Sequence, residues 1–380
     1  MKKRVHALLS LTLIEGLGPV KLKRLLEKKG SPITFLKSFN FSIRKEVTER
    51  ANEINEEVKA LGARVVSYHC KEYPENLKRI VDPPAVIFVK GKIPERLKQS
   101  ISIVGTRKSC PEGRRLAEKA VELMTQHKFP LVSGMALGID TASHKAALLN
   151  GLPTLAVLAH GLDRIHPKQN INLSQRILEY GGALISEHPP STPVSKWMFA
   201  ARNRILVGIS AATVLAESPE SGGSLISIKI ALREGRQTYA FTPPCSYNKR
   251  WDGNRFVIEE GRGIAISNMA DWYRSLLREV PDFRMSFKEV ELKVKEVRIS
   301  EALKQIPEKC KLVYIEVSRE SQSPLEISRV LRIEMSVLRT RLFILEAMGF
   351  VKRLPGDSYS LSQILREFHS IIETTPLLSL

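Results

Sequence analysis

The stretch from Ile101 to Asp140 decides the fold: ISIVGTRKSCPEGRRLAEKAVELMTQHKFPLVSGMALGID. It consists of a short apolar run, a segment of helical periodicity and a second apolar run that ends in a glycine turn. Further apolar runs follow at 154–159 (TLAVLA), 182–187 (GALISE), 212–217 (ATVLAE) and 237–243 (QTYAFTP). Continuous apolar strands that alternate with helices are typical of a parallel sheet covered on both faces. The sequence therefore predicts a Rossmann-like, doubly wound α/β core with a mostly parallel sheet.

The charge of the chain favours an anionic partner. There are 59 Lys and Arg residues against 40 Asp and Glu, which leaves a formal net charge of +19. The excess is +8 within residues 1–50 (12 − 4) and +7 within residues 101–268 (20 − 13). Excess charge in two separate segments indicates a long anion rather than a single phosphate pocket. Nucleic acid and an anionic membrane surface are the two usual candidates.

We expect a cytoplasmic protein without a membrane span. No apolar run approaches the roughly 18 residues that a spanning helix needs. The N-terminus (MKKRVHALLSLTLIEG) begins like a signal peptide, but no small-residue cleavage pattern follows its apolar part. The cysteines form no CxxC pair and have no nearby histidine at a spacing that suits zinc, so no metal site is expected. They are Cys70, Cys110, Cys245 and Cys310.

A helical hairpin is predicted ahead of the core. Apolar residues recur at helical spacing from Val5 to Leu13 and from Val20 to Leu26, on either side of the turn Gly16-Leu17-Gly18-Pro19. This pattern suits a small domain of the helix-hairpin-helix or SAM-like type. Its glycines could offer N–H groups to a phosphate, or the hairpin could serve packing alone, and both interpretations stay open. Residues 63–70 (ARVVSYHC) and 83–91 (PPAVIFVKG) predict two strands that lead into the main sheet.

The C-terminal part is typical of a winged helix. The pattern predicts helices over Glu326–Leu331 and Ser336–Met348, with wing strands at 349–351 and 359–361. The second helix carries only two arginines, Arg339 and Arg341, so DNA reading and protein docking are equally open. The predicted division of the chain is a helical domain (1–60), the core with its lead-in strands (61–275), a charged linker (276–299), the winged helix (300–366) and a tail (367–380).

Glycine-rich turns follow the predicted strands and indicate a phosphate-binding rim. Such turns lie at Gly105-Thr106-Arg107, at 133–140 (SGMALGID), at His160-Gly161 and at 217–224 (ESPESGGS). Ligands of open α/β sheets bind outside the carboxyl ends of the strands. Glycine lets the backbone approach phosphate oxygens, and Ser or Thr adds a hydroxyl donor.

The segment 196–204 (KWMFAARNR) gives this rim the character of a polymer site. It places cations beside aromatic rings, and a nucleobase needs a flat partner for stacking together with a cation for its backbone. The alternative is that Trp197 and Phe199 are core residues, which we expect for at least one of them.

The sequence predicts no catalytic residue and no cofactor. There is no GxxxxGK[ST] run, and GxGxxG is missing at the first strand-to-helix turn. The histidines of the core lack HxE, HExxH or GxSxG context, so we interpret them as packing or hydrogen-bonding residues; they are His144, His160, His166 and His188. Asp140 is expected to cap the helix that follows its turn.

Taken in order, these runs resemble the DNA-processing protein A family (DprA, also called Smf). The matching runs are IVGTRKS, LVSGMALGIDTASHKAAL, TLAVLAHGLDRIHPKQN, GALISEHPP, FAARNRILVGIS, AESPESGGSLIS and DGNRFVIEEG. The resemblance implies a non-enzymatic protein that binds single-stranded DNA, protects incoming or recombining strands and helps to load the RecA recombinase in natural transformation and DNA recombination. It also implies a homodimer formed through the Rossmann-like domain, with a single-stranded-DNA-binding protein as a further partner.

The resemblance assigns the main site residues. The family's arginine after the first strand is matched by Arg107, and its lysine and stacking phenylalanine are matched by Lys196 and Phe199. The chain departs from the family pattern with Ala200 in place of proline and His166 in place of tyrosine, which puts local loop shape in doubt. With the glycine turns added, the expected DNA-binding residues are Gly105, Thr106, Arg107, Ser133, Gly134, Gly138, Lys196, Phe199, Arg202, Asn203, Arg204, Gly222, Gly223 and Ser224.

Two alternatives come from other classes of protein. Nucleotide hydrolases of the lysine-decarboxylase-like (LOG) type carry PGGxGTxxE, but here Ser227 stands where their catalytic glutamate belongs. Hydrolysis without that carboxylate would lack its general acid or base. The other alternative is a transcriptional regulator with a nucleotide-sensing core, which would prefer a specific duplex to any single strand.

Overall fold

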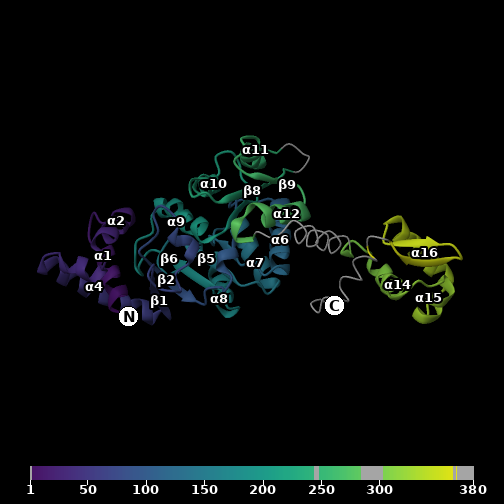
Figure 1. Cartoon of the computed structure of the whole chain (residues 1–380), viewed down its shortest axis with the longest axis horizontal. Coiled ribbons are helices and arrows are strands. Elements are labelled where there is room, and N and C mark those ends of the chain that lie inside the picture. The colour runs from purple at the N-terminus through teal and green to yellow at the C-terminus, as the bar shows by residue number, and fades with distance from the viewer. Residues whose placement is uncertain (1, 244–247, 284–302, 363–364, 366–380) are drawn as a thin grey trace. The chain divides into compact units, whose positions relative to one another are not determined.

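The apolar runs of the core form a nine-stranded sheet in the computed structural model, in the order β1-β2-β6-β5-β4-β3-β7-β8-β9 (Figure 1). The structure describes residues 2–243, 248–283, 303–362 and 365. All six strands predicted for the core are confirmed. They are β3 (Ile101–Val104), β4 (Leu131–Ser133), β5 (Thr154–Leu158), β6 (Ala183–Ser186), β7 (Ala212–Leu215) and β8 (Gln237–Phe241).

The edges of the sheet differ from its centre. In sheet order, β6, β5, β4, β3, β7, β8 and β9 (Ile264–Ile266) all run parallel. At one edge, β1 (Ala63–Ser67) pairs antiparallel with β2 (Val86–Gly91), and β2 pairs antiparallel with β6. The lead-in runs therefore belong to the same sheet. Sequence reasoning missed β9 because the apolar run of this edge strand, Ile264–Ile266, is only three residues long.

Two apolar clusters cover the two faces of the sheet, as the period of two along each strand requires. Ala156 and Leu158 of β5 belong to one cluster, and Leu155 and Val157 belong to the other. The first face packs against α7 (Ile139–Leu149), α8 (Ile171–Glu179) and the N-terminal helices. The second face packs against α5 (Glu75–Lys78), α9 (Lys196–Ile209), α10 (Ser224–Arg233) and α11 (Asp252–Glu259). The remaining elements of this part are α6 (Pro111–Gln126), α12 (Met269–Glu279) and the 3-10 turns Leu97–Gln99, Lys168–Asn170, Lys249–Trp251 and Pro281–Phe283.

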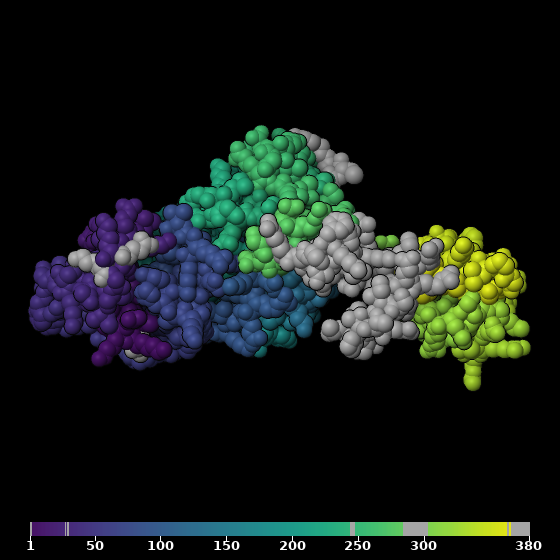
Figure 2. All heavy atoms as spheres, viewed as in Figure 1, coloured from purple at the N-terminus to yellow at the C-terminus, as the bar shows by residue number. Residues whose placement is uncertain are grey.

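The N-terminal segment contains the two predicted helices and two more. They are α1 (Lys3–Thr12), α2 (Pro19–Lys29), α3 (Pro32–Lys37) and α4 (Phe41–Ala60). Leu8, Leu9 and Ile54 are fully buried in the cluster that also holds Phe88 of β2. The four helices therefore share a hydrophobic core with the sheet, and they lie against its β1-β2 edge (Figure 1 and Figure 2).

The packed core extends further than the predicted domain boundary. Leu276 and Leu277 at the end of α12 are buried, and so are Val280 and Phe283 beyond it. The linker expected from residue 276 therefore starts no earlier than residue 284. Most of the predicted linker lies outside the described residues.

The chain divides into two compact units, Met1–Met285 and Ser286–Leu380. The second unit has its own apolar core, which includes Cys310, Val313 and Leu342. Its described elements are α14 (Glu308–Arg319), α15 (Pro324–Leu331), α16 (Met335–Ala347), β10 (Val351–Leu354) and β11 (Ser358–Leu361). The strands β10 and β11 form an antiparallel hairpin. Across both units, no described helix has the length and apolar character required to cross a membrane.

The strand order creates one special place in the sheet. From β3 the chain continues to β4, β5 and β6 on one side, and it then returns to β7 on the other side of β3. The connections that leave β3 and β7 therefore run in opposite directions. A crevice opens at such a switch point, outside the carboxyl ends of the two strands, and ligands of open α/β sheets bind there.

We predict that Asn254 is required for the stability of this end of the sheet. Its buried amide donates to the carbonyls of Leu215, Ala216 and Phe241, and its oxygen accepts the N–H of Ser218 at 2.8 Å. Asn254→Ala leaves these buried groups unpaired and should lower the free energy of unfolding by about 2–3 kcal/mol. Urea unfolding followed by tryptophan fluorescence measures the effect, because all three tryptophans lie in the first unit. Asn172→Ala is the control, since Asn172 is exposed; equal stability of the two variants would contradict the prediction.

Candidate functional site

A pocket of about 400 Å³ occupies the crevice between the carboxyl ends of β3 and β7. The loop after β3, the first two turns of α9 and the start of α10 form its walls. Most of the predicted site residues line it. They are Gly105, Thr106, Arg107, Lys196, Phe199, Arg202, Asn203, Gly222, Gly223 and Ser224.

The ring of Phe199 is the aromatic surface of this pocket. The guanidinium carbon of Arg107 lies 5.3 Å from the ring centroid, within the range of a cation–π contact. The imidazole of His166 meets the ring edge-on at 5.7 Å between centroids. Phe199 is half-buried, whereas Arg107 and Lys196 are exposed and form no ion pair with any described residue. The pocket therefore combines an accessible ring with two uncompensated positive charges.

Arg202 forms the inner wall of the pocket and serves the fold. It is 7% exposed, and its Nη1 donates to the carbonyl of Gly134 at 2.7 Å and to that of Val157. Burial lowers the pKa of Arg202 to about 10, and the nearby carboxylate of Asp140 opposes that shift. The two carbonyls hold the guanidinium in place, so this cation is not free to move toward a ligand.

Asp140 does not cap its helix, contrary to the prediction. The N-cap of α7 is Gly138, and Asp140 lies inside the first turn. Its carboxylate turns back to accept the N–H groups of Gly134 and Ala136 at 3.1 and 3.2 Å. Burial raises the pKa of Asp140, while Arg202 works against this shift. The carboxylate therefore fixes the glycine turn after β4, which forms part of the pocket wall.

Three predicted residues of that turn lie outside the pocket. Ser133 is fully buried, and its hydroxyl donates to the carbonyl of Ile103 at 2.8 Å. A Cβ atom on Gly134 would lie 2.5 Å from Nη2 of Arg202. Gly138 has a φ of 79°, and a Cβ atom there would lie 2.3 Å from the carbonyl oxygen of Thr106. These residues shape the turn and do not face the pocket.

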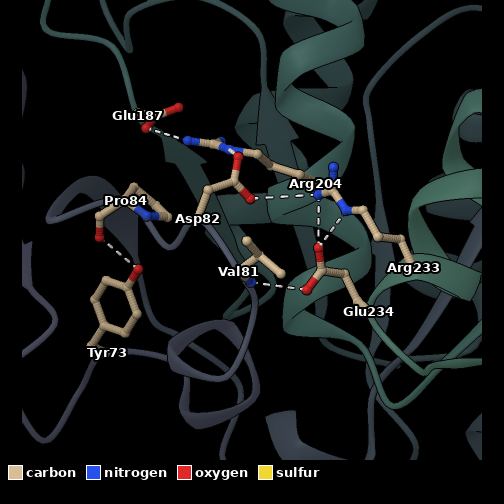
Figure 3. Close-up of polar contacts among 8 residues, drawn as sticks. All are labelled: Tyr73, Val81, Asp82, Pro84, Glu187, Arg204, Arg233 and Glu234. Carbon is tan, nitrogen blue, oxygen red and sulfur yellow. Dashed lines mark hydrogen bonds and ion pairs between the residues drawn. The ribbon is translucent and has the colours of Figure 1, made fainter. Parts of the chain in front are cut away.

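Arg204 is also separated from the expected contact surface. Its Nε donates to Asp82 at 2.9 Å and its Nη2 donates to Glu187 at 2.6 Å, so its charge is compensated inside the protein (Figure 3). The same network includes Arg233, which approaches Asp82 and pairs with Glu234 at 2.7 Å. Arg204 lines a second cavity of about 700 Å³, which lies between α9 and the turn of the N-terminal hairpin. We therefore assign Arg204 to packing.

Neither Trp197 nor Phe199 belongs to the core, contrary to the prediction. Trp197 is 61% exposed at the start of α9, where it borders the second cavity. The residue that packs inward between them is Met198, which is 6% exposed. The aromatic residues therefore remain available on the surface.

Sequence reasoning missed a second group of cations beside the pocket. Lys108, Arg114 and Lys145 line a hollow of about 420 Å³ to which Arg107 also belongs. Lys108 follows Arg107 in the chain, which was a usable signal. Arg114 and Lys145 are brought together only by the packing of α6 against α7, and no local sequence pattern predicts that contact.

The other polar residues near the strand ends have structural partners. His144 is buried with its Nδ1 2.8 Å from the Thr154 hydroxyl, and burial lowers its pKa to about 3. Glu217 is fully buried and accepts the N–H of Cys110 at 2.8 Å, at the start of α6. Within the described ranges, no group of three His, Cys, Asp or Glu residues has a geometry that could hold a metal ion.

We predict that Arg202→Ala destabilises the protein, whereas Lys196→Ala does not. Removing the Arg202 guanidinium leaves two buried carbonyls and the Asp140 carboxylate without their cation, which should cost about 3–5 kcal/mol. Lys196 is exposed, so its loss should change stability by about 0.5 kcal/mol or less. Urea unfolding of both variants measures the difference. Unchanged stability of Arg202→Ala would contradict its assignment to the fold.

Comparisons with known proteins agree on one family. The family model described as DNA recombination-mediator protein A matches residues 64–276, more than half of the chain. DNA processing protein DprA of Bacillus subtilis is 34% identical over 229 residues, which is 60% of this chain and 75% of that protein. DprA of Streptococcus pneumoniae is 36% identical over 198 residues, which is 51% of this chain and 68% of that protein.

Solved structures give the same result. The X-ray structure of S. pneumoniae DprA superimposes with a TM-score of 0.61 at 28% identity and covers 74% of this chain and 99% of that one. A structure of Helicobacter pylori DprA, described for its single-stranded DNA binding mode, shares the fold at 22% identity with a TM-score of 0.50, over 57% of this chain. The family is that of a recombination mediator and not of an enzyme. The matched segment contains the whole of the switch-point pocket, and the chain belongs to the DNA recombination-mediator protein A family.

Proposed function

We propose that the switch-point pocket binds single-stranded DNA. The observation that carries the proposal is the half-buried ring of Phe199, which has the unpaired cation Arg107 over it and shares its pocket with the unpaired cation Lys196. A base can stack on an aromatic ring in any sequence, because every base has a flat π-face, while cations hold the flanking phosphates. The S. pneumoniae and B. subtilis relatives are DNA processing proteins by name, and the H. pylori relative is described as binding single-stranded DNA.

The pocket suits a single strand better than a duplex. In a duplex the bases stack on each other, so a ring inside a pocket of about 400 Å³ cannot reach a base face without opening the helix. The glycines at 222–223 and Gly105 keep the walls close to the backbone of a bound strand. Contacts of this kind hold phosphates and carry no base information, so we expect little sequence preference.

We further propose a role for the bound strand. The protein would protect incoming or recombining single strands and help to load the RecA recombinase on them in natural transformation and DNA recombination. It would act in the cytoplasm as a homodimer, with a single-stranded-DNA-binding protein as a further partner and without a cofactor. The family resemblance supports these points, and a strand held mainly through its phosphates leaves its bases free for hand-over to another protein.

We retain the predicted domain division as a proposal, with a core that extends to Phe283. The helical domain (1–60) corresponds to α1–α4, and the order of α15, α16 and the β10–β11 hairpin supports a winged helix. On α16 the side chain of Phe343 is 68% exposed and that of Val337 is 39% exposed. Because Val337 and Phe343 lie about 120° apart around the helix, they form no shared apolar face, and DNA reading and protein docking are both retained as alternatives for this unit.

The first test of function is binding to oligo-dT. We expect the full chain to bind oligo-dT more tightly than a duplex of equal length, with affinity that falls steeply between about 50 and 200 mM salt. Fluorescence anisotropy with labelled oligonucleotides measures both. Equal or tighter binding to a random duplex would contradict the proposal, and preference for one specific duplex would favour the regulator alternative.

Arg107→Ala and Lys196→Ala should each weaken binding to all single-stranded sequences alike. Each loss removes one phosphate contact, so the slope of log K against log salt concentration should fall by about 0.7 per variant. Lys92→Ala is the matched control, because Lys92 is exposed in the same unit and pairs with Glu95. If both pocket variants bind like the control, the strand is held elsewhere.

Phe199→Ala should cost about 1–3 kcal/mol of binding free energy, since one stacked base loses its ring. Phe41→Ala is the control, because that ring is 70% exposed in the same unit and lies outside the pocket. Titration of oligo-dT measures the loss, and urea unfolding separates it from a folding effect. A variant that binds like the parent would show that no base stacks on Phe199.

A further inference from the structure

A second hollow adjoins the switch-point pocket and has a different chemistry. It measures about 420 Å³ and lies over the first turns of α6 and α7. Four of its lining residues are cations: Arg107, Lys108, Arg114 and Lys145. Ser109 and Thr141 add hydroxyl groups, and Glu118 is the one carboxylate among the residues that line it. The described surface of this hollow is therefore strongly basic and contains no aromatic ring.

The charges of the four cations have no acidic partner among the described residues. Arg114 donates only to the carbonyl and hydroxyl of Ser109. The contrast lies one residue away on the same helix, where Arg115 pairs with Glu112 at 2.8 Å. Like charges gathered in a concave surface repel one another and focus the field outward. Such an arrangement costs free energy in the absence of an anion and attracts one strongly.

The hollow is continuous with the proposed DNA pocket. Arg107 lines both, and its guanidinium lies over the ring of Phe199 at the boundary between them. A strand with a base on Phe199 and a phosphate at Arg107 has its neighbouring phosphates at this boundary. The hollow offers positive charge without a stacking surface, which suits backbone and not bases.

We propose that this hollow is a phosphate-binding extension of the site, in which Lys108, Arg114 and Lys145 hold the phosphodiester backbone of the strand whose base occupies the switch-point pocket. The inference rests on the proposed function and adds the direction that the strand takes from Phe199, toward the first turns of α6 and α7. It also defines the ligand as a continuous polyanion and not as an isolated phosphate. The binding site is therefore longer than the pocket alone.

The test compares two lengths of oligo-dT on the full chain. The dinucleotide dTpdT carries a single phosphodiester, which Arg107 holds beside the stacked base, whereas an oligonucleotide of about 16 nucleotides also reaches the hollow. Lys108→Ala and Lys145→Ala should each lower the salt slope of the longer oligonucleotide by about 0.7 and leave that of the shorter one unchanged. Lys119→Ala is the matched control, because Lys119 is exposed on α6 and does not line the hollow.

Glu118→Gln gives a test that no folding defect can imitate. Removing the carboxylate of the hollow should strengthen binding of the longer oligonucleotide and leave the shorter one unaffected. The inference would be overturned if Lys108→Ala and Lys145→Ala had the same salt slopes as the parent. It would also be overturned if they lowered the slope equally for both oligonucleotide lengths. In either case the pocket could still bind DNA. If the parent bound neither oligonucleotide, the result would contradict the proposed function itself and not only the inference about the hollow.

Discussion

The contact between the ends of β3 and β7 is the constraint on which the rest of the site depends. The two strands lie side by side and parallel, with Val104 opposite Leu215, yet their connections leave in opposite directions. Glu217 fixes the gap that results, because its carbonyl accepts the N–H of Thr106 and its buried carboxylate accepts that of Cys110. A single residue in the loop after β7, Glu217, thus holds both the loop after β3 and the start of α6. The pocket and the neighbouring hollow open on either side of this loop.

Burial separates two kinds of cation around the site. Arg202 and Arg204 are almost fully buried, and carbonyls or carboxylates compensate their charges, since an unpaired buried charge would be costly. Arg107, Lys145 and Lys196 are exposed and have no acidic partner among the described residues. An exposed cation without an acidic partner costs little free energy, so these surface side chains can stay unpaired until a ligand binds. The net charge of +19 therefore indicates which residues could bind an anion only after the buried, compensated arginines are left out.

The sequence predicted the parts of the fold that depend on local patterns. Continuous apolar runs identified β3 through β8, and glycine turns at strand ends identified the switch-point pocket, because both follow from the geometry of a parallel sheet. The short edge strand β9 and the role of Ser133 depend on contacts between distant segments, which periodicity does not contain. Asp140 binds within its own turn, but periodicity does not show that its carboxylate faces back toward Gly134 and Ala136. The same holds for Lys145, which joins Arg114 only through helix packing. Family resemblance supplied Arg107, Lys196 and Phe199 as a set, and the structure brings them to one pocket.

The geometry of α9 explains why its RNR run cannot be a single contact surface. Successive residues of an α-helix are rotated by about 100°, so residues two apart face nearly opposite sides. Lys196, Phe199 and Asn203 recur at i, i+3 and i+7 and share the face that lines the pocket. Trp197, Ala201 and Arg204 recur at i, i+4 and i+7 and share the face that lines the second cavity. The helix is thus a partition between two compartments, one basic and open to a polyanion, the other with its charges already paired. A run of adjacent basic letters in a helix therefore has to be assigned residue by residue, according to the face on which each side chain lies.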